Sequence, residues 1–136
     1  MLDMDNFKLV NDTYGHQEGD KFLKKSVVIF RETLGTQAII GRIGGDDFAV
    51  YIPFEHEEET VIREEVARRL DALLDAFHKQ FDTHYESCKV SLSAGICLRI
   101  TVDGIKLGFE ESYQMADRAL YVSKENGKHQ YNWYED

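Results

Sequence analysis

The stretch Arg42-Ile43-Gly44-Gly45-Asp46-Asp47-Phe48 places two glycines and two adjacent carboxylates between two apolar runs. The flanking runs, 38–40 and 48–52, are rich in β-branched and aromatic residues and are predicted as strands. A Gly-Gly pair between such strands indicates a hairpin turn, and glycine there accepts a positive φ and lets another molecule approach the backbone closely. The tip is therefore either an ordinary solvated turn or a place where a metal ion is held against a phosphate.

The start of the chain strengthens the second possibility. Leu2-Asp3-Met4-Asp5 alternates apolar and acidic residues, so a strand there would project both carboxylates from one face, and four carboxylates could then converge with those of the hairpin. Two carboxylates about 4 Å apart repel by roughly 1 kcal/mol in water and roughly 4 kcal/mol at an effective dielectric constant of about 20, so the cluster requires a cation or a raised pKa. Mg²⁺ or Mn²⁺ fits best, because magnesium is typically held by one or two carboxylates together with substrate phosphates.

The length and composition are typical of one globular domain with a net negative charge. The chain has 136 residues, of which 43% are apolar, enough for one hydrophobic core and too few for two ordinary domains. Its formal net charge of −9 argues against broad binding to nucleic acid or anionic membranes, which requires a basic face. No apolar run reaches about 18 residues and no signal peptide is present, so we expect a cytoplasmic domain without membrane contact.

Apolar periodicity predicts further helices and strands. Helices are expected over about 19–34, 57–81 and 110–126. The last should end with Gly127 just past its cap, and core packing is expected for its residues Leu120 and Tyr121. Alternation over 90–97 predicts a strand buried on one face, and 131–133 predicts a short closing strand. Helices mixed with antiparallel strands in this order indicate an α+β fold with a covered sheet.

Some polar residues have ordinary structural roles open to them. Asp5 or Asn6 is suited to cap a helix that is expected to begin at Phe7, and capping is the commoner role for such residues. Ser91 and Ser93 are most simply the outward face of the strand over 90–97.

Four separated blocks resemble the GGDEF family of diguanylate cyclases, in the family's order and near its spacing. They are Asp3-Met4-Asp5-Asn6-Phe7-Lys8-Leu9-Val10-Asn11-Asp12 with Gly15-His16 and Gly19-Asp20, the hairpin from Arg42 to Phe48, Ser91-Leu92-Ser93-Ala94-Gly95-Ile96, and Ala116-Asp117-Arg118-Ala119-Leu120-Tyr121 with Lys124 and Gly127-Lys128. The resemblance implies an α+β fold similar to nucleotidyl cyclases and polymerase palm domains, with a central, mostly antiparallel sheet covered by helices. It also implies that 1–136 is a single GGDEF domain lacking the family's N-terminal helix and most of its first strand.

The implied activity is that of a diguanylate cyclase, a nucleotidyltransferase of bacterial signal transduction. Two GTP molecules condense to cyclic di-GMP and two pyrophosphates across a homodimer, in a phosphoryl transfer that uses Mg²⁺ or Mn²⁺ as cofactor. By matched position, the metal ligands are Asp3, the backbone carbonyl of Met4, Asp46 and Asp47. Asp46 and Asp47 are the implied catalytic residues, and Asp46 is the candidate for activating the attacking hydroxyl.

The same matching implies a set of residues that bind GTP. They are Asn6, Phe7, Lys8, Asn11, Asp20, Gly44, Gly45, Lys124 and Lys128. The backbone amides of 6–8 would bind the terminal phosphates at a helix start, and the lysines at 124 and 128 would add positive charge there. Asn11 and Asp20 would recognise guanine, because an amide and a carboxylate together satisfy its donor and acceptor edge. The alternative is that these two are turn or cap residues and that the lysines are solvated helix residues.

Departures from the family's pattern bear on activity and regulation. Asp47 stands where the family has Glu and reaches one methylene less, and Lys128 replaces an Arg and lacks its planar fork. The inhibitory RxxD site is absent, since its window reads Gly35-Thr36-Gln37-Ala38, so product feedback through that site is not expected. Any sensor domain would lie upstream of Met1. The alternatives to an active cyclase are a degenerate GGDEF domain that binds GTP as a regulatory ligand without turnover, and a structural dimerisation module.

Overall fold

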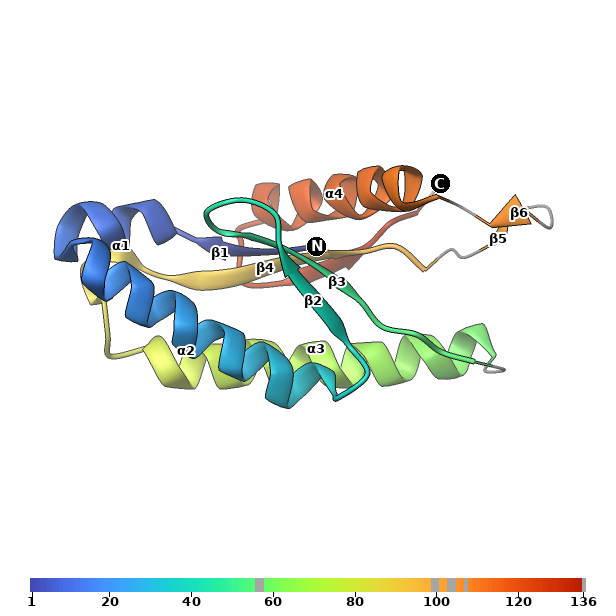
Figure 1. Cartoon of the computed structure of the whole chain (residues 1–136), viewed down its shortest axis with the longest axis horizontal. Coiled ribbons are helices and arrows are strands. Elements are labelled where there is room, and N and C mark those ends of the chain that lie inside the picture. Colours follow the sequence, from blue (N-terminus) through green and yellow to red (C-terminus); the bar gives the residue numbers. More distant parts are fainter. Residues whose placement is uncertain (56–57, 99–100, 103–104, 107, 136) are drawn as a thin grey trace.

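A five-stranded sheet with the order β2-β3-β1-β4-β7 forms the centre of the structure (Figure 1). The computed structural model describes residues 1–55, 58–98, 101–102, 105–106 and 108–135. The strands of this sheet are β1 (Leu2–Asp5), β2 (Ile39–Arg42), β3 (Asp47–Tyr51), β4 (Ser91–Ile96) and β7 (Tyr131–Trp133). Neighbouring strands pair antiparallel, except β4 and β7, which pair parallel. The predicted α+β fold with a mostly antiparallel sheet is confirmed.

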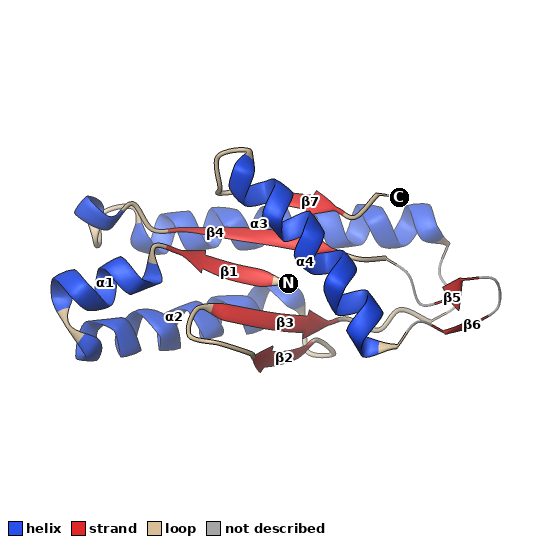
Figure 2. Cartoon of the chain, turned by 90° about the horizontal axis from the view of Figure 1, so that it is seen from above, coloured by secondary structure: helices blue, strands red, loops and turns tan. Residues whose placement is uncertain are grey.

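Helices cover both faces of the sheet. They are α1 (Phe7–Tyr14), α2 (His16–Leu34), α3 (Glu59–Phe81), the short 3₁₀ helix η1 (Glu86–Cys88) and α4 (Phe109–Glu125). The two long helices α2 and α3 pack side by side under one face, and α4 crosses the opposite face (Figures 1 and 2). A separate two-stranded sheet joins β5 (Thr101–Val102) to β6 (Ile105–Lys106). Among the described helices, none is long and apolar enough to cross a membrane.

The core lies between the sheet and the α2–α3 layer. Phe22 and Phe30 are two turns apart on one face of α2 and are fully buried. The ring of Phe22 meets that of Phe81 on α3 edge to face with centroids 4.6 Å apart, and Phe30 meets Phe48 on β3 at 5.2 Å. These contacts fix α2 against both its neighbouring helix and the hairpin, because aromatic rings supply large buried areas in specific geometry.

Two predicted details are corrected by the structure, and a third lies outside the described residues. Helix α2 begins at His16 rather than near Gly19, because Gly15, at φ 92°, ends α1 and the first turn of α2 is polar and therefore gives no apolar periodicity. Tyr121 is 64% exposed, whereas Leu120 is buried as expected, because neighbouring helical residues point in different directions. Position 57, the predicted start of the long helix, lies outside the described residues, and α3 starts at Glu59.

The end of α4 follows the predicted pattern. Gly127 has φ 110°, the left-handed conformation that glycine accepts without strain. The Lys128 N–H donates to the carbonyl of Ser123 at 3.0 Å, and the Gly127 N–H donates to the carbonyl of Lys124 at 3.3 Å, which is the Schellman arrangement. The chain therefore turns sharply after α4 and returns toward the sheet as β7.

An apolar cavity of about 450 Å³ adjoins the beginning of β1. Its lining includes Met1, Val50, Ile52, Ile96 and Phe109. The carboxylates Asp3, Asp46 and Asp47 do not line it, so it is separate from the acidic cluster described below.

Helix α4 packs on β4 through Gly95, which predicts a strong effect of a single methyl group. A Cβ at Gly95 would overlap the backbone N of Leu120 and the backbone O of Ala116, and a helix backbone cannot rotate away as a side chain can. Gly95→Ala is expected to lower the free energy of unfolding in urea by about 1–3 kcal/mol or more. The matched control is Gly41→Ala on β2, where a Cβ meets nothing within 4 Å and a change within about 0.5 kcal/mol is expected. Equal effects at both glycines would contradict this packing.

Candidate active site

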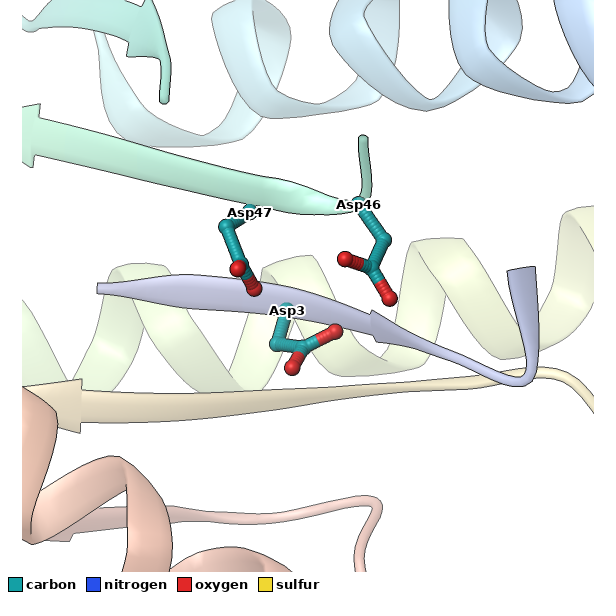
Figure 3. Close-up of side chains that lie close together, drawn as sticks. All are labelled: Asp3, Asp46 and Asp47. Carbon is teal, nitrogen blue, oxygen red and sulfur yellow. The ribbon is translucent and has the colours of Figure 1, made fainter. Parts of the chain in front are cut away.

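Three carboxylates gather where β1 meets the β2–β3 hairpin (Figure 3). Asp3 lies on β1, Asp47 begins β3 directly opposite it in the ladder, and Asp46 ends the hairpin turn. One carboxylate oxygen of each lies within 4.8 Å of the others, and Figure 3 shows the three groups turned toward one another. Asp3 is only 5% exposed, while Asp46 and Asp47 are half-buried. The structure thus brings together the three carboxylates predicted as metal ligands.

Met4, the predicted backbone ligand, faces the same hairpin. Its N–H donates to the carbonyl oxygen of Asp46 at 3.0 Å, and its side chain is fully buried in the core. In an antiparallel ladder, a hydrogen-bonded residue presents its N–H and its C=O to the same neighbouring strand. The Met4 carbonyl is therefore directed toward the hairpin that carries Asp46 and Asp47.

Asp5 does not join the cluster, so the expected set of four carboxylates is reduced to three. Its Oδ2 accepts hydrogen bonds of 2.7 Å from the hydroxyls of both Ser91 and Ser93 on the neighbouring strand β4. Ser93 is fully buried, so its predicted outward position is wrong. The cause is helix α4, which covers this face of the sheet.

The Asp3 carboxylate is paired with a lysine from α4. Lys124, in the last turn of that helix, forms an ion pair with Asp3 Oδ2, while the buried Asp3 Oδ1 has no hydrogen-bond partner among the described residues. Burial raises the pKa of Asp3 to about 7; Lys124 opposes this shift and the negative charge of Asp46 adds to it. Burial lowers the pKa of Lys124, but its hydrogen bond to Asp3 and the negative charges of Asp3, Asp5 and Asp46 together outweigh that effect and leave this pKa raised.

This environment fits a hard divalent cation. The cluster offers three carboxylates, a backbone carbonyl directed toward them, and one buried carboxylate oxygen that nothing in the described chain satisfies. Oxygen ligands of this kind suit Mg²⁺ or Mn²⁺. In their absence the Lys124 ammonium supplies the positive charge beside Asp3.

The glycine turn has open space around it. Gly44 and Gly45 are exposed, and both lie outside the group of glycines with positive φ, so the positive φ considered for the turn is not observed. A Cβ at Gly45 would meet nothing within 4 Å, and one at Gly44 would only touch Asp47 at 3.7 Å. The fold itself therefore does not require glycine at either position.

Arg42 supports this turn and was missed as a site residue by the sequence analysis. Its guanidinium donates hydrogen bonds to the carbonyl of Gly44 at 3.1 Å and to that of Gly45 at 3.1 and 2.8 Å. The available signal was an arginine directly before a glycine-rich turn, where its fork can reach several carbonyls.

The predicted guanine-binding pair lies around the α1–α2 junction. Asn11 is half-buried on α1, and Asp20 is exposed on α2. The Asn11 Oδ1 occupies the space that a Cβ at Gly19 would need, so glycine at 19 allows Asn11 to lie against α2 one residue before Asp20. Gly19 belongs to the first block of the resemblance, but the sequence assigned it no supporting role.

The start of α1 carries the predicted phosphate-binding amides. Asn6 alone connects β1 to α1, which begins at Phe7, and the first N–H groups of a helix have no partner within it. Asn6 occupies the N-cap position, but its side chain makes no capping hydrogen bond, so capping is not its role. Lys128 Nζ lies 3.5 Å from Asn6 Oδ1, whereas Lys8 is exposed on α1. Residues from both ends of the chain thus meet at this helix start.

Comparison with known proteins identifies relatives along nearly the whole chain. The family described as "Diguanylate cyclase, GGDEF domain" matches residues 1–130. The probable diguanylate cyclase DgcF of Escherichia coli K12 is 33% identical over 130 residues, which cover 94% of this chain and 39% of that protein. Diguanylate cyclase DosC of the same strain is 31% identical over 128 residues, covering 94% of this chain and 26% of that protein. The chain thus spans well under half the length of these relatives.

Solved structures of similar fold belong to the same family. The active GGEEF domain of a diguanylate cyclase from Vibrio cholerae matches with a TM-score of 0.71 and 28% identity, covering 99% of this chain and 80% of that one. A microbial GGDEF domain studied for its interaction with cyclic di-GMP matches with a TM-score of 0.70 and 32% identity, covering 97% and 74%. The fold and its neighbours define an α+β domain of the cyclase palm type. Within that class, the chain belongs to the GGDEF family.

The raised pKa of Asp3 predicts a pH dependence of stability in the metal-free protein. The unfolded chain releases the Asp3 proton near pH 3.8 and the folded chain near 7, so the folded state binds more protons between these values. The contribution of Asp3 to the free energy of unfolding should therefore fall as the pH rises from about 4 to about 7, by at most ~4 kcal/mol, and then level off.

Urea unfolding of the wild type and of Asp3→Asn in EDTA, across this pH range, measures that contribution. The variant lacks the titrating group, so the difference in unfolding free energy between the two proteins should change over the range. A difference that stays constant would show that Asp3 titrates at its ordinary pKa.

Proposed function

We propose that this domain is a diguanylate cyclase that condenses two GTP molecules to cyclic di-GMP and two pyrophosphates, using Mg²⁺ or Mn²⁺ and acting as a homodimer. The observation that carries the proposal is the cluster of Asp3, Asp46 and Asp47, whose carboxylate oxygens lie within 4.8 Å of one another. Like charges this close are stabilised by a bound cation, and an oxygen-only ligand set beside an open glycine turn suits a metal–nucleotide complex. Membership of the GGDEF family supports the same chemistry.

The chain's own residues divide the work in this proposal. Asp3, Asp46, Asp47 and the Met4 carbonyl would hold the cation, which would stabilise charge on the attacking and leaving oxygens. Asp46, half-buried in the turn, is also the candidate to accept the proton of the attacking 3′-hydroxyl. With the carboxylates neutralised, Lys124 would no longer be held by Asp3, and its ammonium could turn to the phosphates.

Nucleotide contacts follow from the same geometry. The free space at Gly44 and Gly45 would admit the nucleotide close to the backbone, since neither position is required to be glycine by the fold. Asn11 and Asp20 would recognise guanine, so GTP should be preferred over ATP. A homodimer is needed because each domain would hold one GTP and the two must meet in line. The cyclase rate per protein should therefore rise with protein concentration.

A second candidate is a degenerate domain that binds GTP as a regulatory ligand without turnover. It is motivated by Asp47, which is one methylene shorter than the glutamate expected at that position, and by Lys128, which lacks the fork of arginine. The inclusion of Asp47 in the carboxylate cluster favours the active enzyme over this alternative.

Product formation tests the proposal directly. The domain, at concentrations that allow dimers, is incubated with GTP and Mg²⁺ or Mn²⁺, and cyclic di-GMP is measured by mass spectrometry. Asp46→Asn should lower the rate at least ~100-fold without lowering the melting temperature, because it removes a charged ligand and the candidate base but no packing contact. The matched control is Asp75→Asn, an exposed residue of α3 that forms an ion pair with the exposed Lys79, which should retain the wild-type rate.

The outcomes separate the candidate functions. Saturable GTP binding without product would leave only the regulatory domain, and absence of binding would leave only a dimerisation module. Unchanged product formation in Asp46→Asn would refute the assignment of the site.

The length of the side chain at 47 generates a further prediction. Asp47→Glu should raise the cyclase rate by about 2–10-fold, because small misplacements of a catalytic group are costly and the longer side chain reaches further toward the cation. Rates are compared at saturating GTP and metal, with Asp75→Glu as the control for added length elsewhere. A lower rate in Asp47→Glu would mean that the cluster is already adapted to aspartate.

A further inference from the structure

Asn6 has a conformation and contacts that helix capping does not explain. Its backbone lies in the left-handed region, at φ 68° and ψ 22°, which asparagine tolerates better than most residues. It occupies the N-cap position of α1, yet its side chain makes no hydrogen bond to that helix. The side chain is instead directed to two other segments of the chain.

The first of these segments connects η1 to β4. Asn6 Nδ2 donates to the carbonyl oxygens of Cys88 at 2.8 Å and Lys89 at 3.1 Å. The β1–β4 ladder ends with the pair Asp5–Ser91, so the Asn6 amide joins the two strands just beyond their last backbone pair. Lys89 is itself left-handed, with φ 52°, so two unusual backbone turns are tied together by one side chain.

The second segment is the turn that follows α4. Lys128 Nζ donates to Asn6 Oδ1 at 3.5 Å, across 122 residues of sequence. The backbone of Lys128 is held by its Schellman hydrogen bond to Ser123, but its side chain is exposed and flexible. The side-chain carbonyl of Asn6 therefore gives this ammonium a neutral partner next to the first backbone N–H groups of α1, which a helix does not pair internally.

We propose that Asn6 is a positioning residue that joins the N-terminal turn of α1 and the Lys128 ammonium into one receptor for the terminal phosphates of a nucleoside triphosphate. This inference rests on the proposed function, because it concerns the same nucleotide. The amide donors of Asn6 anchor the turn, and its Oδ1 orients the lysine. A phosphate oxygen, being charged, is a stronger acceptor than the neutral Oδ1 and takes over the ammonium when the nucleotide binds.

The chemistry of position 6 separates this role from that of a simple turn residue. Glycine would keep the left-handed backbone but lose all three hydrogen bonds of the side chain. Aspartate would keep an acceptor for Lys128, lose the donors to Cys88 and Lys89, and place a negative charge where phosphate is expected. A turn residue requires only the backbone conformation, so the glycine variant should then bind phosphate normally.

Binding of inorganic tripolyphosphate, GTP and guanosine to the 136-residue chain, measured by calorimetry, tests the proposal. Asn6→Gly should weaken tripolyphosphate and GTP binding by about tenfold each and leave guanosine binding unchanged. Asn6→Asp, which keeps the size of the side chain, should lower the affinity for tripolyphosphate and GTP further. Lys79→Ala is the matched control, because it removes an exposed lysine on α3 that is paired with Asp75.

A double variant with Lys128 distinguishes positioning of the lysine from a merely structural role of Asn6. In a Lys128→Ala background, Asn6→Gly should cause a smaller further loss of tripolyphosphate affinity than it does in the wild type, since the two residues act as a unit. The melting temperatures of all variants are measured beside the affinities, so that a loss of affinity through unfolding is recognised.

The results distinguish failure of this inference from failure of the proposed function. If the wild type binds tripolyphosphate and Asn6→Gly binds it equally well, the positioning role is overturned while the function stands. An equal loss of guanosine and tripolyphosphate affinity in Asn6→Gly would likewise overturn it, by showing a general disturbance of the fold. If the wild type binds tripolyphosphate but makes no cyclic di-GMP, the phosphate-binding role is supported and the proposed cyclase activity is refuted. A wild type that binds no tripolyphosphate overturns the receptor.

Discussion

The burial of the Asp3 carboxylate beside two further carboxylates is the constraint on which the site depends. Asp3 and Asp47 are directly opposite each other in the β1–β3 ladder, and Asp46 adds a third charge within 4.8 Å. Like charges directly opposite each other destabilise a pair of strands. The ion pair of Lys124 with Asp3 therefore compensates for a cost built into the sheet, and a divalent cation would compensate for it more completely.

The packing of α4 makes this compensation possible. Gly95 lets the backbone of α4 lie directly on β4, which brings the last turn of the helix, and Lys124 with it, over Asp3. The left-handed turn at Gly127 then returns the chain toward Asn6, where the Lys128 ammonium meets the start of α1. The same helix end thus supplies one lysine to the carboxylates and another to the neighbouring helix start.

The sequence was most informative about elements that have a repeating pattern. The hairpin around Gly44 and Gly45, the strand that carries Asp3, and the apolar stripes of the helices all follow from periodicity and turn chemistry. The beginning of α2 was missed because its first turn is polar, and the exposure of Tyr121 was missed because an isolated aromatic residue does not reveal its direction.

The partners of polar side chains were harder to predict than the elements that carry them. Asp3 and Asp5 look alike in an alternating strand, yet the register with β4 gives Asp5 two serine hydroxyls and leaves Asp3 to the hairpin and Lys124. If the carboxylates form a metal site, a divalent cation should displace Lys124 from Asp3. A crystal structure with Mn²⁺ tests this by anomalous diffraction: we expect a peak among Asp3, Asp46 and Asp47 with Lys124 moved away, and an intact ion pair without a peak would show that the carboxylates do not hold a metal.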